Sequence, residues 1–216
     1  MTIMQPVMER RGKFITFEGG EGCGKSTHIA EILLRLKANG QPAILVREPG
    51  GTGVGEQIRH ILQYSKQSAA MVPEAEILLF CASRAQLVRE IILPALTERQ
   101  VVIADRFFDS TTVYQGVGRK IGAQPVEFIN RFAVGECLPD LTIVIDLDPR
   151  VGMERVRGRE LFDRMENLSL DFYERVRQGY LELATREPQR VKLVNGNREK
   201  EVVQRDVWDL VSHVIS

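Results

Sequence analysis

The stretch GGEGCGKS at residues 19–26 decides the fold of this chain. It fits the pattern G-x-x-x-x-G-K-[ST] in full. An apolar, β-rich run (KFITFE, 13–18) precedes it, and a helical pattern that places Ile29, Ile32 and Leu36 on one face follows it. Glycines let successive backbone N–H groups turn inward, and a helix N-terminus adds partial positive charge. The stretch is therefore predicted to be a phosphate-binding loop between a strand and a helix.

The residues of this loop have separate tasks in phosphate binding. Lys25 can reach the β and γ oxygens of a nucleoside triphosphate, and the Ser26 hydroxyl can bind Mg²⁺. A chance glycine-rich turn is the alternative, and the full match between a strand and a helix disfavours it. We expect the triphosphate site to consist of Gly19, Gly20, Glu21, Gly22, Cys23, Gly24, Lys25, Ser26 and Thr27.

Strand and helix patterns alternate along the rest of the chain. The expected strands are five short apolar runs: 13–18, 42–46, 101–104, 141–147 and 190–194. Further helices are expected at 54–62, about 74–96, 151–156, 168–184 and 200–214. This alternation predicts an α/β, three-layer P-loop NTPase fold, with a central five-stranded parallel sheet and helices on both faces. We expect one domain over 1–216, with a flexible N-terminal extension at 1–12.

The composition excludes several classes of protein. The 216 residues carry 29 basic and 29 acidic side chains, so a nucleic-acid binder is not expected. The three cysteines are odd in number and form no CxxC pair, which favours reduced thiols in the cytoplasm over a disulfide framework or a zinc site. No run has membrane-spanning length, and the N-terminus lacks a signal-peptide core. The histidines His28, His60 and His213 show no catalytic arrangement, and we expect them at the surface.

A phosphate-binding loop alone does not separate GTPases, motor ATPases and small-molecule kinases. The chain has no Asn-Lys-x-Asp motif for guanine, and Asp105 is followed by Arg106 rather than by x-x-Gly. It is also too short for most motor domains. Arginines gather late in the chain, between 150 and 164, where a mobile lid can bring them over phosphates. These features favour a small-molecule kinase.

Several motifs then occur in one order: Phe17-Glu18-Gly19, the phosphate loop, Arg47-Glu48-Pro49-Gly50-Gly51-Thr52, Ala82-Ser83-Arg84-Ala85-Gln86, Asp105-Arg106-Phe107 and Tyr114-Gln115-Gly116. In this order, with the Arg-rich segment after them, they resemble bacterial thymidylate kinases over nearly the whole chain. The resemblance implies transfer of the γ-phosphoryl group of ATP to dTMP, giving dTDP and ADP. It also implies Mg²⁺ as cofactor and a homodimer.

The resemblance assigns an acceptor site, part of which the residues support by themselves. Phe80 and Arg84 are four residues apart and share a helix face, where a ring and a guanidinium can stack on a base and bond its edge. Without the family context, Phe80 would be taken as core. Arg106 and Asp105 follow a buried strand end, where ligands bind in such sheets. The implied dTMP-binding residues are Glu48, Pro49, Arg59, Phe80, Arg84, Arg106, Thr111, Tyr114 and Gln115, with Ser26 and Asp105 at the metal.

The Arg-rich lid, at about 150–167, completes the expected catalytic set. A charge run is usually a solvated helix face. In bacterial relatives whose phosphate loop lacks an arginine, however, the lid supplies one. This loop carries Glu21, where many relatives have Asp, and no arginine. By resemblance, Arg159 stabilises transition-state charge, Arg155 stacks on adenine, and Glu21 lies near the acceptor 3′-hydroxyl or the metal, so that Lys25, Arg106, Arg159 and Glu21 form the catalytic set.

Other functions stay open at the level of the sequence. One alternative is a kinase whose acceptor is another nucleoside monophosphate or a deoxynucleoside. The cations Arg59 and Arg106 favour an acceptor that already carries a phosphate. A switch that hydrolyses ATP slowly and signals to a protein partner is the alternative from another class. The missing GTPase motifs and the Arg-rich segment disfavour it.

Overall fold

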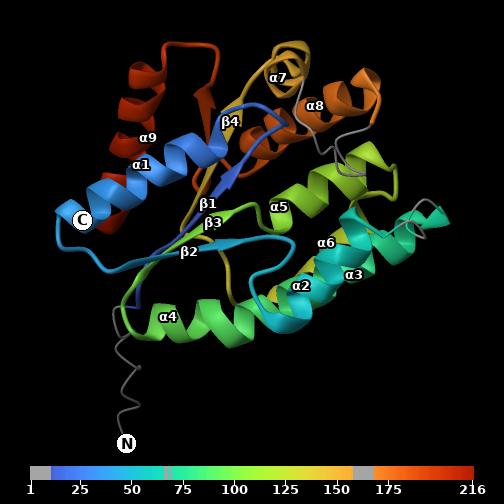
Figure 1. Ribbon diagram of the computed structural model, residues 1–216, viewed down its shortest axis with the longest axis horizontal. Helices are drawn as coiled ribbons and strands as arrows, with labels where there is room; N and C mark the ends of the chain where they lie inside the picture. Colours follow the sequence, from blue (N-terminus) through green and yellow to red (C-terminus); the bar gives the residue numbers. More distant parts are fainter. Residues whose placement is uncertain (1–10, 66–67, 69, 158–167) are drawn as a thin grey trace, which may run out of the picture.

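The computed structural model describes residues 11–65, 68, 70–157 and 168–216. Within these ranges, five parallel strands form one sheet in the order β2-β3-β1-β4-β5 (Figure 1). The strands are β1 (Phe14–Glu18), β2 (Ala43–Arg47), β3 (Val101–Asp105), β4 (Leu141–Asp146) and β5 (Val191–Asn195). β1, which leads into the phosphate loop, lies at the centre of the sheet between β3 and β4. The loops that follow β1 and β3 therefore lie side by side at the same edge of the sheet.

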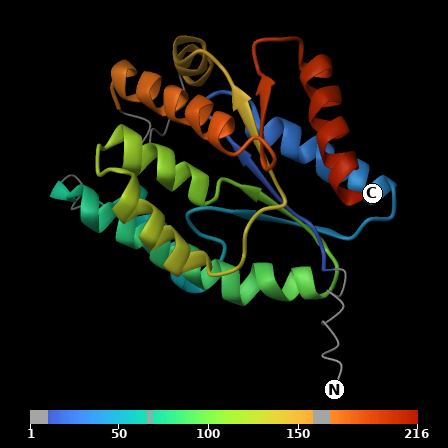
Figure 2. The same cartoon turned by 180° about the vertical axis from the view of Figure 1, so that it is seen from behind.

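Helices cover both faces of the sheet (Figures 1 and 2). α1 (Lys25–Ala38) and α9 (Lys200–Ile215) cover one face and pack on residues such as Ile15 and Ile103. Residues of opposite parity, such as Phe14 and Val102, face the other helices, as expected for strands buried on both sides. The remaining helical segments, of which α7 also packs on the first face through Val151, are α2 (Gly53–Gln63), α3 (Pro73–Leu87), η2 (Val88–Ile92), α4 (Leu93–Thr97), α5 (Phe108–Thr111), η3 (Thr112–Gly118), α6 (Ala123–Val134), α7 (Pro149–Val156) and α8 (Leu170–Arg186).

The predicted fold class is confirmed, with two differences in detail. α3, η2 and α4 continue one another, as expected for 74–96, but η2 is a π-helical segment. α6 was not predicted: Phe128 and Phe132 on it are 75% and 81% exposed, so its apolar residues do not outline a single buried face.

The prediction that the histidines lie at the surface is wrong for one of them. His28 is buried on α1, where its Nδ1 lies 2.7 Å from Gln204 Oε1 of α9. His28 is therefore part of the contact between α1 and α9. The three cysteines are buried and unpaired. The extension at 1–12 and the lid at 150–167 fall mostly outside the described residues. In the part that is described, no helix has the length and apolar character that crossing a membrane requires.

Candidate functional site

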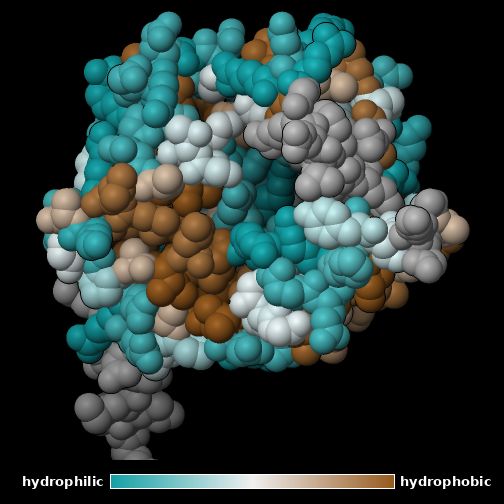
Figure 3. All heavy atoms as spheres, viewed as in Figure 1, coloured by the Kyte–Doolittle hydropathy of each residue, from teal (hydrophilic) through white to brown (hydrophobic). Residues whose placement is uncertain are grey.

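A cavity of about 800 Å³ opens at the carboxyl ends of β1 and β3. The phosphate loop and α7 line it on one side, and α2, α3 and η3 line it on the other. In the space-filling view, it lies in the hydrophilic hollow at the centre of the molecule (Figure 3). The cavity joins all the predicted site residues that the structure describes, except Gly19 and Gly20, which lie just behind it.

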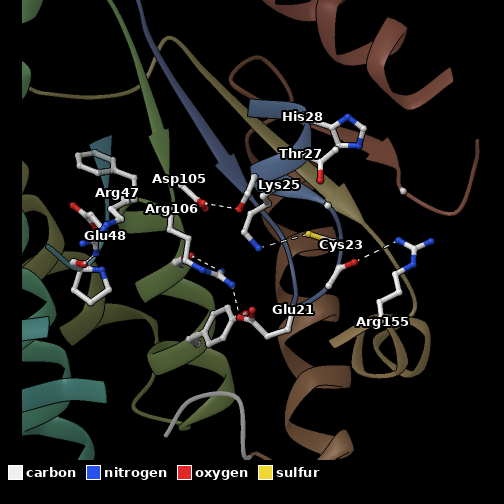
Figure 4. Close-up of a pocket in the computed structure, with 18 of the residues that line it drawn as sticks. Glu21, Cys23, Lys25, Thr27, His28, Arg47, Glu48, Asp105, Arg106 and Arg155 are labelled. Carbon is white, nitrogen blue, oxygen red and sulfur yellow. Dashed lines mark hydrogen bonds and ion pairs between the residues drawn. The ribbon is translucent and has the colours of Figure 1, made fainter. Parts of the chain in front are cut away.

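The phosphate loop has the expected curled backbone. Gly24 precedes α1 with φ 97°, a left-handed conformation that favours glycine. The Lys25 side chain is buried and follows the curl, so that Nζ donates to Gly20 O at 3.0 Å and lies 3.7 Å from Cys23 Sγ (Figure 4). The lysine thus lies where the phosphates of a bound nucleotide would pass, while Thr27 is exposed at the rim.

The phosphate loop touches α7 backbone to backbone. A Cβ at Gly22 would overlap the Gly152 carbonyl, and a Cβ at Gly152 would overlap the Glu21 carbonyl. Arg155, one turn further along α7, is exposed and directs Nη1 at Gly22 O, at 3.4 Å. The helix that leads into residues 158–167 is therefore seated directly on the loop.

Ser26 and Asp105 meet at the carboxyl end of β3. The Ser26 hydroxyl donates to the Asp105 carboxylate at 3.3 Å (Figure 4). Throughout the described part of the chain, no three His, Cys, Asp or Glu side chains cluster in a way that would hold a metal ion. A hydroxyl and one carboxylate beside a phosphate cradle fit Mg²⁺, which keeps several waters and takes further ligands from substrate phosphates.

Arg106 lies between the two halves of the cavity. Its backbone has φ 69°, an uncommon value for a residue with a side chain. Nη1 donates to Gly19 O at 3.0 Å, Nη2 pairs with Glu21 at 2.5 Å, and the guanidinium stacks 5.1 Å from the centre of the Tyr114 ring. Burial acts against the charged form, but Tyr114, Glu21 and nearby acidic groups hold the pKa of Arg106 well above its usual value. Arg106 is therefore a permanent cation.

Arg84 is enclosed at the opposite end of the cavity. The side chain is 1% exposed and pairs with buried Glu48 at 2.6 Å. Burial would lower the pKa of Arg84, but Glu48, Cys81 and Glu18 together more than compensate, so the pKa lies above the usual value. The guanidinium donates to four side chains: Glu48, Cys81, Thr111 and Asn130.

The other predicted acceptor residues line the same end. Phe80 is half-buried, one helical turn before Arg84 on α3. Arg59 of α2 donates to Pro49 O at 2.9 Å. Gln115 lines the cavity, but its amide donates to Glu76 of α3 at 2.9 Å. The structure thus brings these predicted residues together, although the contact of Gln115 with Glu76 was not foreseen.

Sequence reasoning missed a buried polar cluster behind Arg106. It consists of Glu18, Ser110 and Tyr180, linked by hydrogen bonds of 2.5 to 3.1 Å. The only signal in the sequence is an acidic residue at the end of an apolar strand. Arg159, the predicted lid arginine, lies outside the described residues.

Comparisons with known proteins find relatives of this chain. The family model for thymidylate kinase matches residues 17–207. A thymidylate kinase of Carboxydothermus hydrogenoformans is 48% identical over 200 residues, which are 93% of this chain and 95% of that protein. One of Kosmotoga olearia is 46% identical over 194 residues, covering 90% and 92% of the two chains. One of Deinococcus radiodurans is 41% identical over 202 residues, covering 94% and 97%.

The family model matches most of the chain, and the relatives are more than 40% identical to it over nearly their full length. This chain belongs to the thymidylate kinase family.

Proposed function

We propose that this chain transfers the γ-phosphoryl group of ATP to dTMP, giving dTDP and ADP, as a single kinase domain in the cytoplasm. One observation carries the proposal: the phosphate loop, Arg106 and the Phe80–Arg84 pair line one continuous cavity. Such a cavity can hold two nucleotides with their phosphates facing each other. Phosphoryl transfer depends mainly on such positioning and on neutralising charge.

The donor half of the cavity suits ATP. The backbone N–H groups of residues 19–26 would hold the β- and γ-phosphates, and Lys25 would leave the carbonyls that it now contacts to reach their oxygens. Ser26 and Asp105 would hold Mg²⁺, which neutralises charge on these oxygens when it is bound. Arg155 would stack on the adenine, and Arg159 would act on the transition-state charge.

The acceptor half suits a thymine nucleotide. Phe80 would stack on the base, and Arg84 would donate to a base carbonyl in place of, or shared with, one of its present acceptors. Thr111 would lie at the base edge, Tyr114 would lie near the sugar, and Arg59 would bind the acceptor phosphate. Glu48 and Pro49 form the adjoining wall, and the ion pair of Glu48 with Arg84 makes this carboxylate a support for the base-reading arginine.

Arg106 would bridge the donor and acceptor phosphates. Glu21 now occupies its Nη2, and this pair is partly open to solvent, so an incoming phosphate oxygen can replace the carboxylate. Glu21 would then be released toward the acceptor sugar or the metal.

The first test is an assay of ADP release with ATP, Mg²⁺ and a panel of acceptors: dTMP, dUMP, dCMP, dGMP, AMP and thymidine. We expect fast turnover with dTMP, slower turnover with dUMP and negligible turnover with the rest. Preference for another monophosphate would overturn the roles of Phe80, Arg84 and Thr111. ADP release without any acceptor would favour a nucleotide-dependent switch.

A homodimer is part of the proposal. α2 and α6 both pack against α3, and the three helices expose large apolar side chains: Ile61, Leu78, Phe128 and Phe132. Two phenylalanines more than 70% exposed on one helix are typical of a surface that another chain covers. Light scattering at micromolar concentration should give twice the mass of one chain, and a monomeric mass would contradict this part.

A further inference from the structure

Glu18 is the last residue of β1 and stands immediately before the phosphate loop. Its carboxylate is fully buried and does not line the substrate cavity. It accepts hydrogen bonds from the Phe107 backbone N–H at 2.8 Å, the Ser110 hydroxyl at 2.5 Å and the Tyr180 hydroxyl at 2.9 Å. Burying a carboxylate is costly unless hydrogen bonds replace its contacts with water. The three donors therefore have to stay in place around Glu18.

Ser110 connects this carboxylate to Arg106. Its Oγ lies 2.5 Å from Glu18 Oε2 and 3.2 Å from Arg106 Nη1. An ionised carboxylate only accepts hydrogen bonds, and a guanidinium only donates them. Ser110 has a single hydroxyl proton, and the Glu18 carboxylate at 2.5 Å is a nearer and stronger acceptor for it than the Tyr180 hydroxyl at 3.1 Å, so the proton goes to Glu18 and the Ser110 lone pairs face Arg106. The direction of every bond in this chain is therefore fixed.

We propose that Glu18, acting through Ser110, is a positioning residue that holds the guanidinium of Arg106 in place for phosphoryl transfer. Glu18 also fixes the Phe107 N–H, directly after the positive-φ backbone of Arg106. Arg106 is thereby held next to its backbone, through Phe107, and at the Nη1 edge of its guanidinium, through Ser110. Nη2 can still exchange Glu21 for a phosphate oxygen. The inference rests on the proposed function of Arg106.

The surroundings of Glu18 make the arrangement of Glu18, Ser110 and Arg106 dependent on pH. Burial and the charge of Asp109 raise the pKa of Glu18 to about 7, against the influence of Arg106 and the bonds from Ser110 and Phe107. Among the described residues, Tyr180 of α8 and Arg84 of α3 are further titratable groups that interact with it. A protonated Glu18 has a proton of its own to donate, so the direction of the Ser110 bond is no longer fixed. We expect kcat to rise as the pH increases through about 7.

The test compares Glu18→Gln, Ser110→Ala and the double variant in the dTMP assay at pH 8. The glutamine keeps the shape, but its N–H group would donate toward Ser110 and reverse the bond between residue 18 and Ser110, so the Ser110 proton would no longer be held away from Arg106. We expect kcat to fall about 10- to 100-fold in each single variant, because small displacements of a reacting group have effects of this size, while KM changes much less. The double variant should lose no more than the worse single one, and E18Q should flatten the pH dependence.

Asp109→Asn is the matched control. Asp109 is also fully buried and lies on α5 near Ser110, but its partners are Arg190, at 2.6 Å, and the Thr142 hydroxyl, at 3.0 Å. We expect D109N to lose stability and to keep kcat per folded molecule at pH 8, where Glu18, with a pKa of about 7, is mostly ionised in the wild type as well. Losses that multiply in the double variant, an unchanged kcat in E18Q, or an equal loss of kcat in D109N would each overturn the proposal.

A structural readout separates this inference from the proposed function. If the wild-type protein shows no dTMP-dependent turnover, the proposed function fails. A crystal structure of E18Q with Arg106 displaced would still support the positioning link, and one with Arg106 unmoved would contradict it.

Discussion

Two arginine–glutamate pairs at opposite ends of the cavity have similar lengths and very different surroundings. Arg84 and Glu48 lie 2.6 Å apart, with side chains 1% and 3% exposed. Arg106 and Glu21 lie 2.5 Å apart, with side chains 18% and 22% exposed. The first pair is a fixed part of the base-binding wall, since it is enclosed and both Nε and Nη2 of Arg84 donate to Glu48. The second can exchange partners, as a residue that receives a phosphate must do.

The largest effect should come from Arg106 itself. Arg106→Ala removes the cation that we place between the phosphates, so we expect kcat to fall by about 10³- to 10⁵-fold, as losses of transition-state arginines do. Steady-state kinetics with dTMP measure this. Arg186→Ala, an exposed arginine on α8, is the control that should leave kcat unchanged. If kcat of R106A fell by less than tenfold, Arg106 would not act on the phosphates. The distinction between its exchangeable pair with Glu21 and the fixed pair of Arg84 with Glu48 would then have no functional meaning.

Arg159→Ala tests the predicted lid arginine. We expect kcat to fall by about 10³-fold or more, because this residue would supply the charge that the phosphate loop lacks. The same assay decides the question, and a change of only a few-fold would take Arg159 out of this role.

Breaking the buried pair should appear in stability. Glu48→Ala leaves the charge of Arg84 unpaired in the interior, and we expect a loss of about 3–5 kcal/mol in the free energy of unfolding. Glu56→Ala, which breaks the half-exposed pair with Arg47, should cost about 1 kcal/mol or less. Urea denaturation measures both. Similar losses in the two variants would show that burial does not separate these pairs.

The pH dependence of stability should reveal Glu18. Its pKa lies near 7 in the folded protein, above the ordinary value of 4.5, so the folded state binds the extra proton. The contribution of this proton to the free energy of unfolding is present in full below about pH 4.5 and is lost as the pH rises through 7. Glu18→Gln does not titrate. From pH 5 to 8 the stability of E18Q relative to the wild type should therefore rise, by about 2–3 kcal/mol at 1.36 kcal/mol per pKa unit. A constant difference between the two proteins would contradict this.

The smallest expected effect concerns Arg59. Arg59→Ala should raise the KM for dTMP about tenfold, the equivalent of about 1.5 kcal/mol for a charge-assisted hydrogen bond, with little change in the KM for ATP. Equal changes in both values would place Arg59 outside the acceptor half.

The sheet and the phosphate loop could be predicted because each rests on local sequence. The run LTIVID of β4, for example, is mostly apolar because both of its faces are buried. α6 could not be found in this way, since its exposed Phe128 and Phe132 blur the pattern of a buried face. His28 was misplaced because its partner Gln204 is 176 residues away.

The candidate site was predictable at the level of residues but not of their pairings. The motifs marked Glu48, Arg84, Glu21 and Arg106 as neighbours of a ligand. That each glutamate would pair with one arginine depends on how loops after different strands meet, which local sequence does not record. Glu18 was overlooked for the same reason, because its three donors come from β3, α5 and α8 and their connections.

The backbone contact between Gly22 and Gly152 has a consequence for inheritance. Any side chain at either position would push apart the phosphate loop and the helix that leads toward Arg159, and no change at the other position can restore the lost space. The two glycines are 130 residues apart in the sequence, but selection should retain or lose them together, because the contact needs both. A lineage that loses one of them cannot recover the contact except by reversion.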